Sequence, residues 1–192
     1  MTSERKRILV TCPPMLGMID EFRGAFEEKN LELTAAKVIQ TMSEAELIET
    51  VPDFHGWIIG DDPATAAVLE AGKKGELLAI VKWGVGVDNV DFDAARKLGI
   101  PASNTPGVFG REVADLAMNY VGGLARQSFF IDRQIRTAFA WPKPAGISLA
   151  DKTVALVGFG DIGRNVAKRL LAADMKVAAY DPYFQNPDNL QV

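Results

Sequence analysis

The sequence predicts an α/β fold in two parts, and two observations lead to this prediction. Short β-rich runs alternate with helical patterns over almost the whole length, which is typical of parallel strands joined by crossover helices. The alternation is interrupted after the turn Asn104 to Gly107, and a second strand and helix series begins at Lys152. We therefore expect one domain over residues 1–103 and a second, incomplete domain over residues 104–192.

Apolar runs of strand length mark the sheet of the first domain. The expected strands are Ile8–Cys12, Leu31–Ala36, Trp57–Gly60, Leu77–Lys82 and Ile100–Ser103. Capping residues, a proline in a first turn and a closing glycine mark the helices between them. These signals predict helices over Leu16–Lys29, after the capping-box pair Ser43 and Glu46, from Asp62-Pro63 to about Ala71, and from Asp91 to Gly99. Together they predict a flavodoxin-like lobe with a parallel sheet and helices on both faces.

The second part begins with an unusually long helical pattern. Residues from Glu112 to about Ala138 contain no proline and keep apolar residues at helical spacing, so a single long helix is expected there. Pro142, Pro144 and Gly146 then break the pattern.

Composition excludes several classes of protein. Of the 192 residues, 48% are hydrophobic and 24% are charged, as in a globular protein, and the net charge of −4 gives no field that would attract nucleic acid. The basic start Met1 to Arg7 is followed by too short an apolar run for a signal peptide, and no run reaches membrane-spanning length. The single cysteine, Cys12, is expected to be a buried apolar residue. A cytoplasmic protein that binds neither membrane nor nucleic acid is the expectation.

The strongest local signal is a strand that runs into a glycine-rich turn and an amphipathic helix. Residues Thr153 to Val157 form the strand, and the turn has the pattern G-x-G-x-x-G. This pattern comprises Gly158, Phe159, Gly160, Asp161, Ile162 and Gly163. A second strand, Lys176 to Tyr180, ends at Asp181, where a carboxylate can accept hydrogen bonds from ribose hydroxyls. We expect the first half of a Rossmann dinucleotide-binding domain, with NAD as cofactor and no metal.

A second glycine-rich turn follows the strand that ends near Lys82. The backbone N–H groups of Val85 and Gly86 could bind an anion there, and Lys82 would add positive charge. The alternative is a plain strand-to-helix turn capped by Asp91. The motif by itself does not decide between them.

These segments, in their order, resemble the D-isomer-specific 2-hydroxyacid dehydrogenases, and more closely the phosphoglycerate-dehydrogenase-like branch. The family's G-V-G-x-D-N-[IV]-D loop, its N-T-P-G turn with a following E-V-A-[ED], and its V-G-F-G-x-I-G fingerprint have counterparts here. They are Gly84 to Asp91, Asn104 to Gly107 with Glu112 to Asp115, and Val157 to Gly163. The ordered set is far more specific than any one motif, and it covers nearly the whole chain.

The resemblance implies a role for each segment. The backbone at Val85 and Gly86 would hold the carboxylate of a 2-hydroxy or 2-keto acid, and Asn104 to Gly107 would form the hinge between domains. Arg136 and Trp141 resemble the family's arm after the long helix, which implies a homodimer. Trp141 could instead cover its own domain.

The family's catalytic arginine, glutamate and histidine have no counterpart in the sequence. The only histidine, His55, precedes a strand of the first domain and is expected to be a surface or turn residue. No catalytic residue is therefore assigned, and the 192 residues alone are expected to be inactive and prone to association through an open edge of the strand Thr153 to Val157.

Three interpretations follow from this division. The chain is the N-terminal portion of a longer enzyme, or a short homologue that binds a dinucleotide or a partner without catalysis, or a flavodoxin-like signalling domain that binds no nucleotide.

Overall fold

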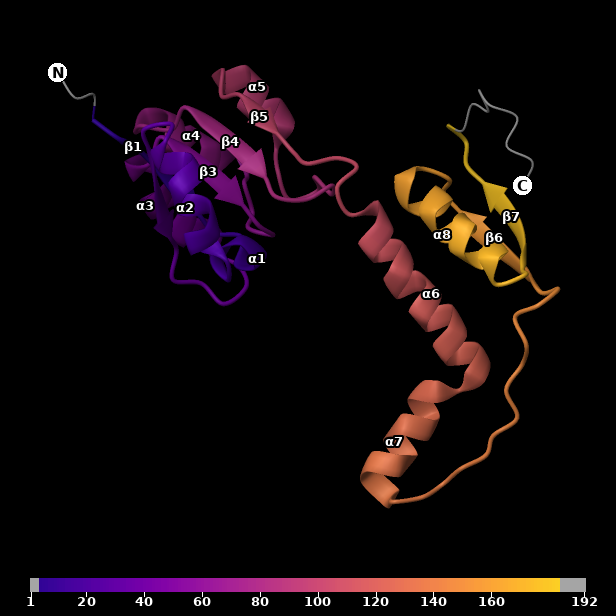
Figure 1. The fold of residues 1–192 in the computed structure, drawn as a ribbon. Helices are drawn as coiled ribbons and strands as arrows, with labels where there is room; N and C mark the ends of the chain where they lie inside the picture. The colour runs from indigo at the N-terminus through magenta and orange to yellow at the C-terminus, as the bar shows by residue number, and fades with distance from the viewer. Residues whose placement is uncertain (1–3, 184–192) are drawn as a thin grey trace. The chain divides into compact units, whose positions relative to one another are not determined.

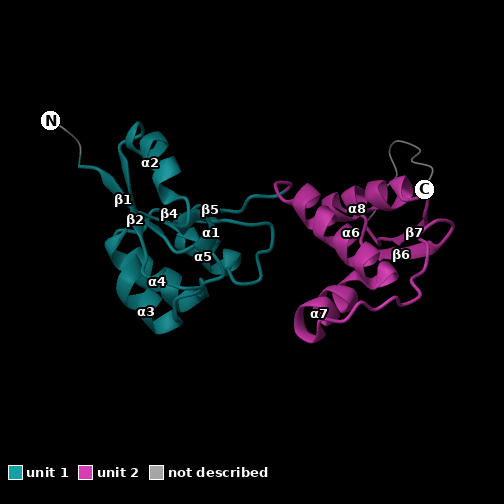
Figure 2. Cartoon of the chain, turned by 60° about the horizontal axis from the view of Figure 1, so that its bottom comes forward, with its two compact units in different colours: residues 1–106 teal, residues 107–192 magenta. Residues whose placement is uncertain are grey.

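The computed structural model describes residues 4–183, and the chain divides into two compact units (Figure 2). Unit 1 comprises residues 1–106 and unit 2 comprises residues 107–192. The division falls inside the Asn104 to Gly107 turn, close to the boundary expected at residues 103 and 104. The first three residues of the basic segment Met1 to Arg7 lie outside the described residues.

The sheet of unit 1 consists of parallel strands in the order β2-β1-β3-β4-β5 (Figure 1). Its strands are β1 (Lys6–Val10), β2 (Leu31–Ala35), β3 (Gly56–Ile59), β4 (Ala79–Lys82) and β5 (Ala102–Ser103). This is the flavodoxin-like order, so the expected fold class is confirmed. Each end of these strands lies within two residues of its expected limit.

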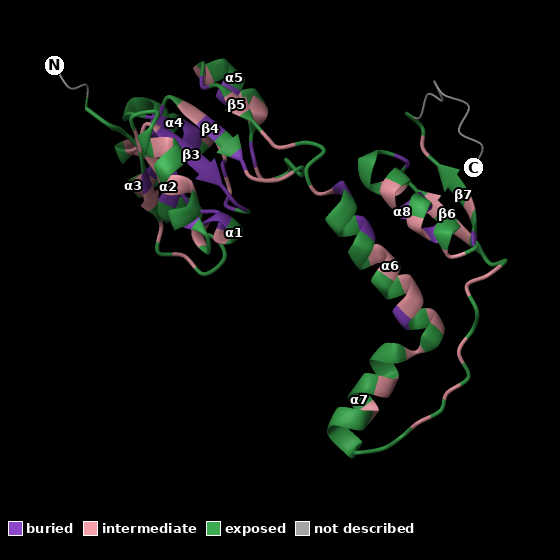
Figure 3. Cartoon of the chain, in the orientation of Figure 1, coloured by how far each residue is buried: buried purple, intermediate pink, exposed green. Residues whose placement is uncertain are grey.

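Both faces of this sheet are covered by helices, because successive side chains of a strand point to opposite faces. Leu9 joins one apolar core, whereas the next residue, Val10, joins the other. Figure 3 shows that the buried residues of this unit gather along the sheet. The helices are α1 (Pro13–Leu16), α2 (Ile19–Glu27), α3 (Glu44–Thr50), the short 3-10 helix η1 (Val51–Asp53), α4 (Ala66–Lys74) and α5 (Phe92–Leu98).

Three of the predicted helix ends are confirmed. Ser43 and Glu46 form the capping box at the start of α3. The Asp91 side chain accepts a hydrogen bond from the N–H of Ala94 at 2.8 Å, and Gly99 ends α5 with a left-handed φ of 66°. These ends were predictable because each depends only on neighbouring residues.

Two predicted helices of unit 1 were wrong in detail. The helix expected over Leu16–Lys29 is interrupted at Gly17 and Met18, because Pro13 and Pro14 start a separate turn, α1, directly after β1. The helix expected from Asp62 begins instead after Thr65, whose hydroxyl caps the N–H of Val68.

The single cysteine lies between β1 and α1, beyond the end of the strand in which it was expected. It is buried, as predicted, and desolvation by burial raises the pKa of its thiol above the ordinary value.

Unit 2 contains α6 (Gly110–Arg126), α7 (Ser128–Ala138), β6 (Thr153–Val157), α8 (Asp161–Ala172) and β7 (Lys176–Tyr180). The single long helix expected over residues 112–138 was wrong, because the chain turns at Gln127, which has a left-handed φ of 56°. The ring of Phe129 fills the space that a Cβ at Gly123 would occupy. The absence of a side chain at Gly123 therefore allows Phe129 of α7 to pack against α6.

The strands β6 and β7 pair in parallel, with Thr153 opposite Lys176 and Val157 opposite Tyr180. Within residues 4–183 no other strand pairs with β6, and the Val157 side chain is 89% exposed. One edge of β6 is therefore open in the described part of the chain. No helix within those same residues is long and apolar enough to cross a membrane.

Candidate functional site

The glycine fingerprint forms the turn between β6 and α8, and each of its glycines meets a different constraint. Gly158 has a φ of +95°, which side chains other than glycine rarely adopt. A Cβ at Gly163 would overlap the carbonyl oxygen of Gly158, so a side chain there would push the helix off the strand. A Cβ at Gly160 would point into open space. That space is where a pyrophosphate would approach the backbone.

The turn is anchored by residues of β7 and the position that follows it. The N–H of Gly158 donates to the carbonyl oxygen of Tyr180 at 2.8 Å, and the N–H of Phe159 donates to Oδ2 of Asp181 at 2.7 Å. The other Asp181 oxygen accepts from the N–H of Tyr183 at 2.8 Å. Asp181 is thus held at the end of β7, beside the fingerprint, as the sequence predicted.

The geometry of this turn fits a dinucleotide. The N-terminal N–H groups of α8 have no acceptor within the helix, since every helix leaves its first N–H groups unpaired. Gly160 stands at the N-cap and offers no side chain to satisfy them. The backbone of Asp161, Ile162 and Gly163 can therefore donate to a phosphate at the positive end of the helix dipole.

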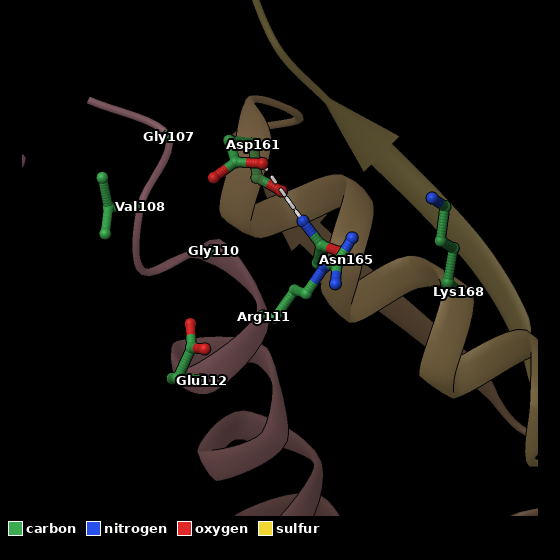
Figure 4. A pocket seen from close by; sticks show the side chains of 8 residues that line it. All are labelled: Gly107, Val108, Gly110, Arg111, Glu112, Asp161, Asn165 and Lys168. Carbon is green, nitrogen blue, oxygen red and sulfur yellow. Dashed lines mark hydrogen bonds between the residues drawn. The ribbon is translucent and has the colours of Figure 1, made fainter. Parts of the chain in front are cut away.

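The side chain of Asp161 is directed elsewhere. Figure 4 shows its carboxylate beside Gly110 at the start of α6, with a hydrogen bond from Nδ2 of Asn165 at 3.1 Å. A Cβ at Gly110 would overlap this carboxylate. Only the backbone of Asp161 is thus left for the cofactor role expected from the sequence. The polar pocket drawn in Figure 4 is lined by Gly107, Val108, Gly110, Arg111, Glu112, Asp161, Asn165 and Lys168.

In unit 1, the loop that follows β4 presents two backbone donors to solvent. Val85 and Gly86 are exposed, and within the part of the chain that the structure describes their N–H groups donate to no protein acceptor. The neighbouring Gly84 is fixed, because its N–H donates to Oγ1 of Thr105 and its oxygen accepts from the N–H of Thr105, both at 3.0 Å. Nδ2 of Asn104 donates to the carbonyl oxygen of Val85 at 2.9 Å.

This loop therefore presents two unpaired backbone N–H groups from a fixed turn, the arrangement that the sequence analysis expected of an anion site. The φ of +148° at Gly84 favours glycine, and the hydrogen bonds of Asn104 and Thr105 hold the loop in place.

A comparison with protein families decides what these two turns belong to. Residues 12–182 match the family model described as the D-isomer specific 2-hydroxyacid dehydrogenase, catalytic domain. The chain belongs to this family.

Sequence relatives within the family are named for different activities. The chain is 37% identical over 158 residues to a hydroxypyruvate reductase of Thermotoga maritima, covering 81% of this chain and 49% of the relative. It is also 37% identical over 180 residues to a D-3-phosphoglycerate dehydrogenase of Archaeoglobus fulgidus, covering 92% of this chain and 32% of the relative. The chain thus spans about a third to a half of the length of these relatives.

Solved structures lead to the same family. An NAD+-bound 3-phosphoglycerate dehydrogenase of Entamoeba histolytica matches with a TM-score of 0.77 and 26% identity, covering 95% of this chain and 56% of that chain. A Thermus thermophilus protein, TT0316, matches with a TM-score of 0.80 and 33% identity, covering 95% of this chain and 58% of that chain.

Lys82 was expected to contribute a free positive charge to the substrate site of this 2-hydroxyacid dehydrogenase chain, but the structure pairs it with a carboxylate. Its side chain is only 6% exposed, and Nζ donates to Oδ1 of Asp61 at 2.9 Å and to the carbonyl oxygen of Gly60. The sequence placed Lys82 beside an anion as a source of charge. The structure gives that charge an internal partner that the sequence analysis missed.

Asp62 and Asn89 were also missed. The carboxyl group of Asp62 is fully buried and accepts from Oγ1 of Thr11 and from the N–H groups of Met42 and Gly60. Nδ2 of Asn89 donates to the carbonyl oxygens of Gly60 and Asp62, which ties the Gly84 to Asp91 loop to the end of β3. The signal that could have found this network is two aspartates directly after a buried strand, at the sheet edge where loops bind ligands.

His55 lies far from the Val85 and Gly86 donors. It directly precedes β3, whereas the donors follow β4, and these parallel strands place the two at opposite ends of the sheet. Four residues of strand span about 13 Å. Nδ1 of His55 accepts from the N–H of Arg7 at 3.1 Å, so the ring has a structural role in its turn. Within residues 4–183, no group of acidic, histidine or cysteine side chains could hold a metal ion.

Proposed function

We propose that this chain supplies the substrate-binding lobe and the first dinucleotide-binding unit of an NAD-dependent D-2-hydroxyacid dehydrogenase. The observation that carries the proposal is the pair of unpaired N–H groups at Val85 and Gly86, held by the hinge residues Asn104 and Thr105, in a chain that also has a complete glycine fingerprint. Non-catalytic interpretations are not favoured, because the relatives are named as reductases and dehydrogenases.

The described residues have binding and orienting roles in this proposal. The N–H groups of Val85 and Gly86 donate to the substrate carboxylate, and the start of α8 donates to the cofactor phosphates. Bound NAD would accept the hydride from the hydroxyl-bearing carbon. A general base must take the hydroxyl proton, and we assign that role to none of the residues 4–183, since His55 lies at the wrong end of its sheet.

The proposal is tested with the protein at its natural length. NADH formation is measured at 340 nm with a panel of D- and L-2-hydroxy acids. We expect turnover with at least one D-isomer and none with its L-isomer. Absence of turnover across the whole panel, in a protein that is folded by circular dichroism, would contradict the proposed function.

Asp181 should make the enzyme prefer NAD to NADP. Its carboxylate is anchored at the end of β7 by the N–H groups of Phe159 and Tyr183, where it would accept from the adenosine ribose and repel a 2′-phosphate. We expect Asp181→Ala to reduce the ratio of kcat/KM for NAD to kcat/KM for NADP by about tenfold or more, which is about 1.4 kcal/mol.

Lys176→Ala is the matched control for Asp181, because Lys176 lies at the other end of the same strand. It should leave the cofactor ratio unchanged. Equal use of both cofactors by the unmodified enzyme would contradict the assignment of Asp181.

We propose that the enzyme is a homodimer that uses α7 and the segment after it. None of the α7 residues is buried, and Phe139 and Trp141 are 95% and 79% exposed. Exposed aromatic side chains of this kind typically mark an interface. Phe139→Asp should shift the protein toward monomers in sedimentation velocity at micromolar concentration, and the left-handed backbone at this position tolerates aspartate better than phenylalanine.

The control for the interface is Ile39→Asp, a change of the same type at a side chain of unit 1 that is 98% exposed. This variant should sediment like the unmodified protein. A monomeric unmodified protein, or a Phe139→Asp variant that remains dimeric, would argue against this interface.

A further inference from the structure

A polar pocket adjoins the anion-binding turn of unit 1. It is lined by Asp61, Lys82, Trp83, Gly84, Gly86, Asp88 and Asn89. Three of these residues carry charge, two negative and one positive, and all of them lie within the same compact unit. A substrate held by the N–H groups of Val85 and Gly86 would place the rest of its carbon chain in or beside this pocket.

The single positive charge of the pocket is already neutralised. Nζ of Lys82 is held by Oδ1 of Asp61 and by the carbonyl oxygen of Gly60. A buried ammonium group needs such partners because its desolvation is costly. The Asp61 side chain, by contrast, is 76% exposed, so the part of the ion pair that faces an incoming ligand is negative. The Lys82 stem also lies against Gly84, since a Cβ there would be 3.3 Å from Cε of Lys82.

We propose that Asp61 is a specificity-determining residue that limits this enzyme to 2-hydroxy acids whose remaining substituent is uncharged. The inference rests on the proposed function. A phosphate monoester brings close to two further negative charges and needs free cationic donors. Within the described residues that line the pocket, no cation other than Lys82 is available, and Lys82 is paired.

The charge of this pocket distinguishes between the activities for which the relatives are named. One sequence relative is named a hydroxypyruvate reductase and another a D-3-phosphoglycerate dehydrogenase. Their sequence identities to this chain are equal at 37%, so identity cannot decide between a free and a phosphorylated hydroxymethyl group. The charge of the pocket favours the free one.

The test compares D-glycerate with 3-phospho-D-glycerate as substrates of the natural-length protein with NAD. Asp61 is largely exposed, so its repulsion of a phosphate a few ångströms away amounts to about one to three powers of ten in rate. We expect kcat/KM for D-glycerate to exceed that for the phosphorylated acid by about 100-fold or more, and Asp61→Asn to reduce this ratio by about tenfold. Asparagine keeps an oxygen that can accept from Lys82, so the fold is retained.

Asp93→Asn is the matched control. Asp93 lies on α5 in an exposed ion pair with Arg96 at 2.7 Å, and its replacement changes the net charge by the same amount outside the pocket. It should leave the substrate ratio unchanged. If Asp61→Asn unfolds the protein, Asp61→Ser provides the second variant, and the ratio of the unmodified enzyme tests the inference independently.

The possible outcomes separate the two claims. Comparable use of both acids by the unmodified enzyme, or a ratio that Asp61→Asn and Asp93→Asn change equally, overturns the role of Asp61 and leaves the proposed function intact. Absence of turnover with every 2-hydroxy acid overturns the proposed function, and the inference with it.

Discussion

Replacing Gly163 with alanine is expected to weaken NAD binding by about 100-fold or more, which corresponds to about 2.7 kcal/mol. The new Cβ would overlap the carbonyl oxygen of Gly158. That oxygen cannot easily move, because Gly158 is fixed at a φ of +95° and its N–H donates to the carbonyl oxygen of Tyr180. The start of α8 would have to shift instead, and its N–H groups would no longer point at the pyrophosphate. Titration calorimetry with NAD measures the effect.

Two further glycines provide controls for this result. A Cβ at Gly160 would meet no protein atom within 4 Å, so Gly160→Ala should retain thermal stability and still weaken NAD binding by blocking close approach of the phosphates. A Cβ at Gly122 in α6 also meets nothing, and Gly122→Ala should bind NAD normally and stabilise the helix by about 0.5–1 kcal/mol. Normal NAD affinity in Gly163→Ala would show that the fingerprint is not the cofactor site.

Replacing Asp62 with alanine should lower the free energy of unfolding by about 3 kcal/mol or more. The Asp62 carboxyl group is fully buried, and its loss would leave the N–H groups of Met42 and Gly60 without their acceptor. The hydroxyl of Thr11 would lose the same partner, and that hydroxyl in turn accepts from Nε1 of Trp57 at 2.9 Å. Urea denaturation followed by tryptophan fluorescence measures the change.

Asp93→Ala is the control for this measurement. It removes an equally acidic but exposed side chain, and exposed ion pairs contribute at most about 1 kcal/mol. A loss below about 1 kcal/mol in Asp62→Ala would mean that water or neighbouring groups replace the carboxyl group, and that the network does not hold the end of β3.

Local signals were enough to predict much of this protein. The alternation of strands and helices predicted the parallel sheet, because apolar periodicity records which face of each element is buried. The capping box at Ser43 and the left-handed end at Gly99 depend on residues within one turn. The fingerprint from Gly158 to Gly163 was predictable for the same reason. Gly158 needs a positive φ and Gly163 must lack a Cβ, and both requirements arise within the turn itself.

Contacts between distant residues were not predictable in this way. The pairing of Lys82 with Asp61 joins the last residue of β4 to the loop that follows β3, across 21 positions of sequence. The residues next to Asp62 in the sequence predicted that it caps a helix. In the folded protein it is instead buried, and it accepts hydrogen bonds from Thr11 and Met42.

The sequence by itself therefore determined the order of the elements, the position of the glycine fingerprint and the position of the exposed turn at Val85 and Gly86. Only the tertiary structure decided the charge that this turn presents to a ligand. The positive charge of Lys82 is neutralised by Asp61, and the folded sheet brings these two side chains within hydrogen-bonding distance.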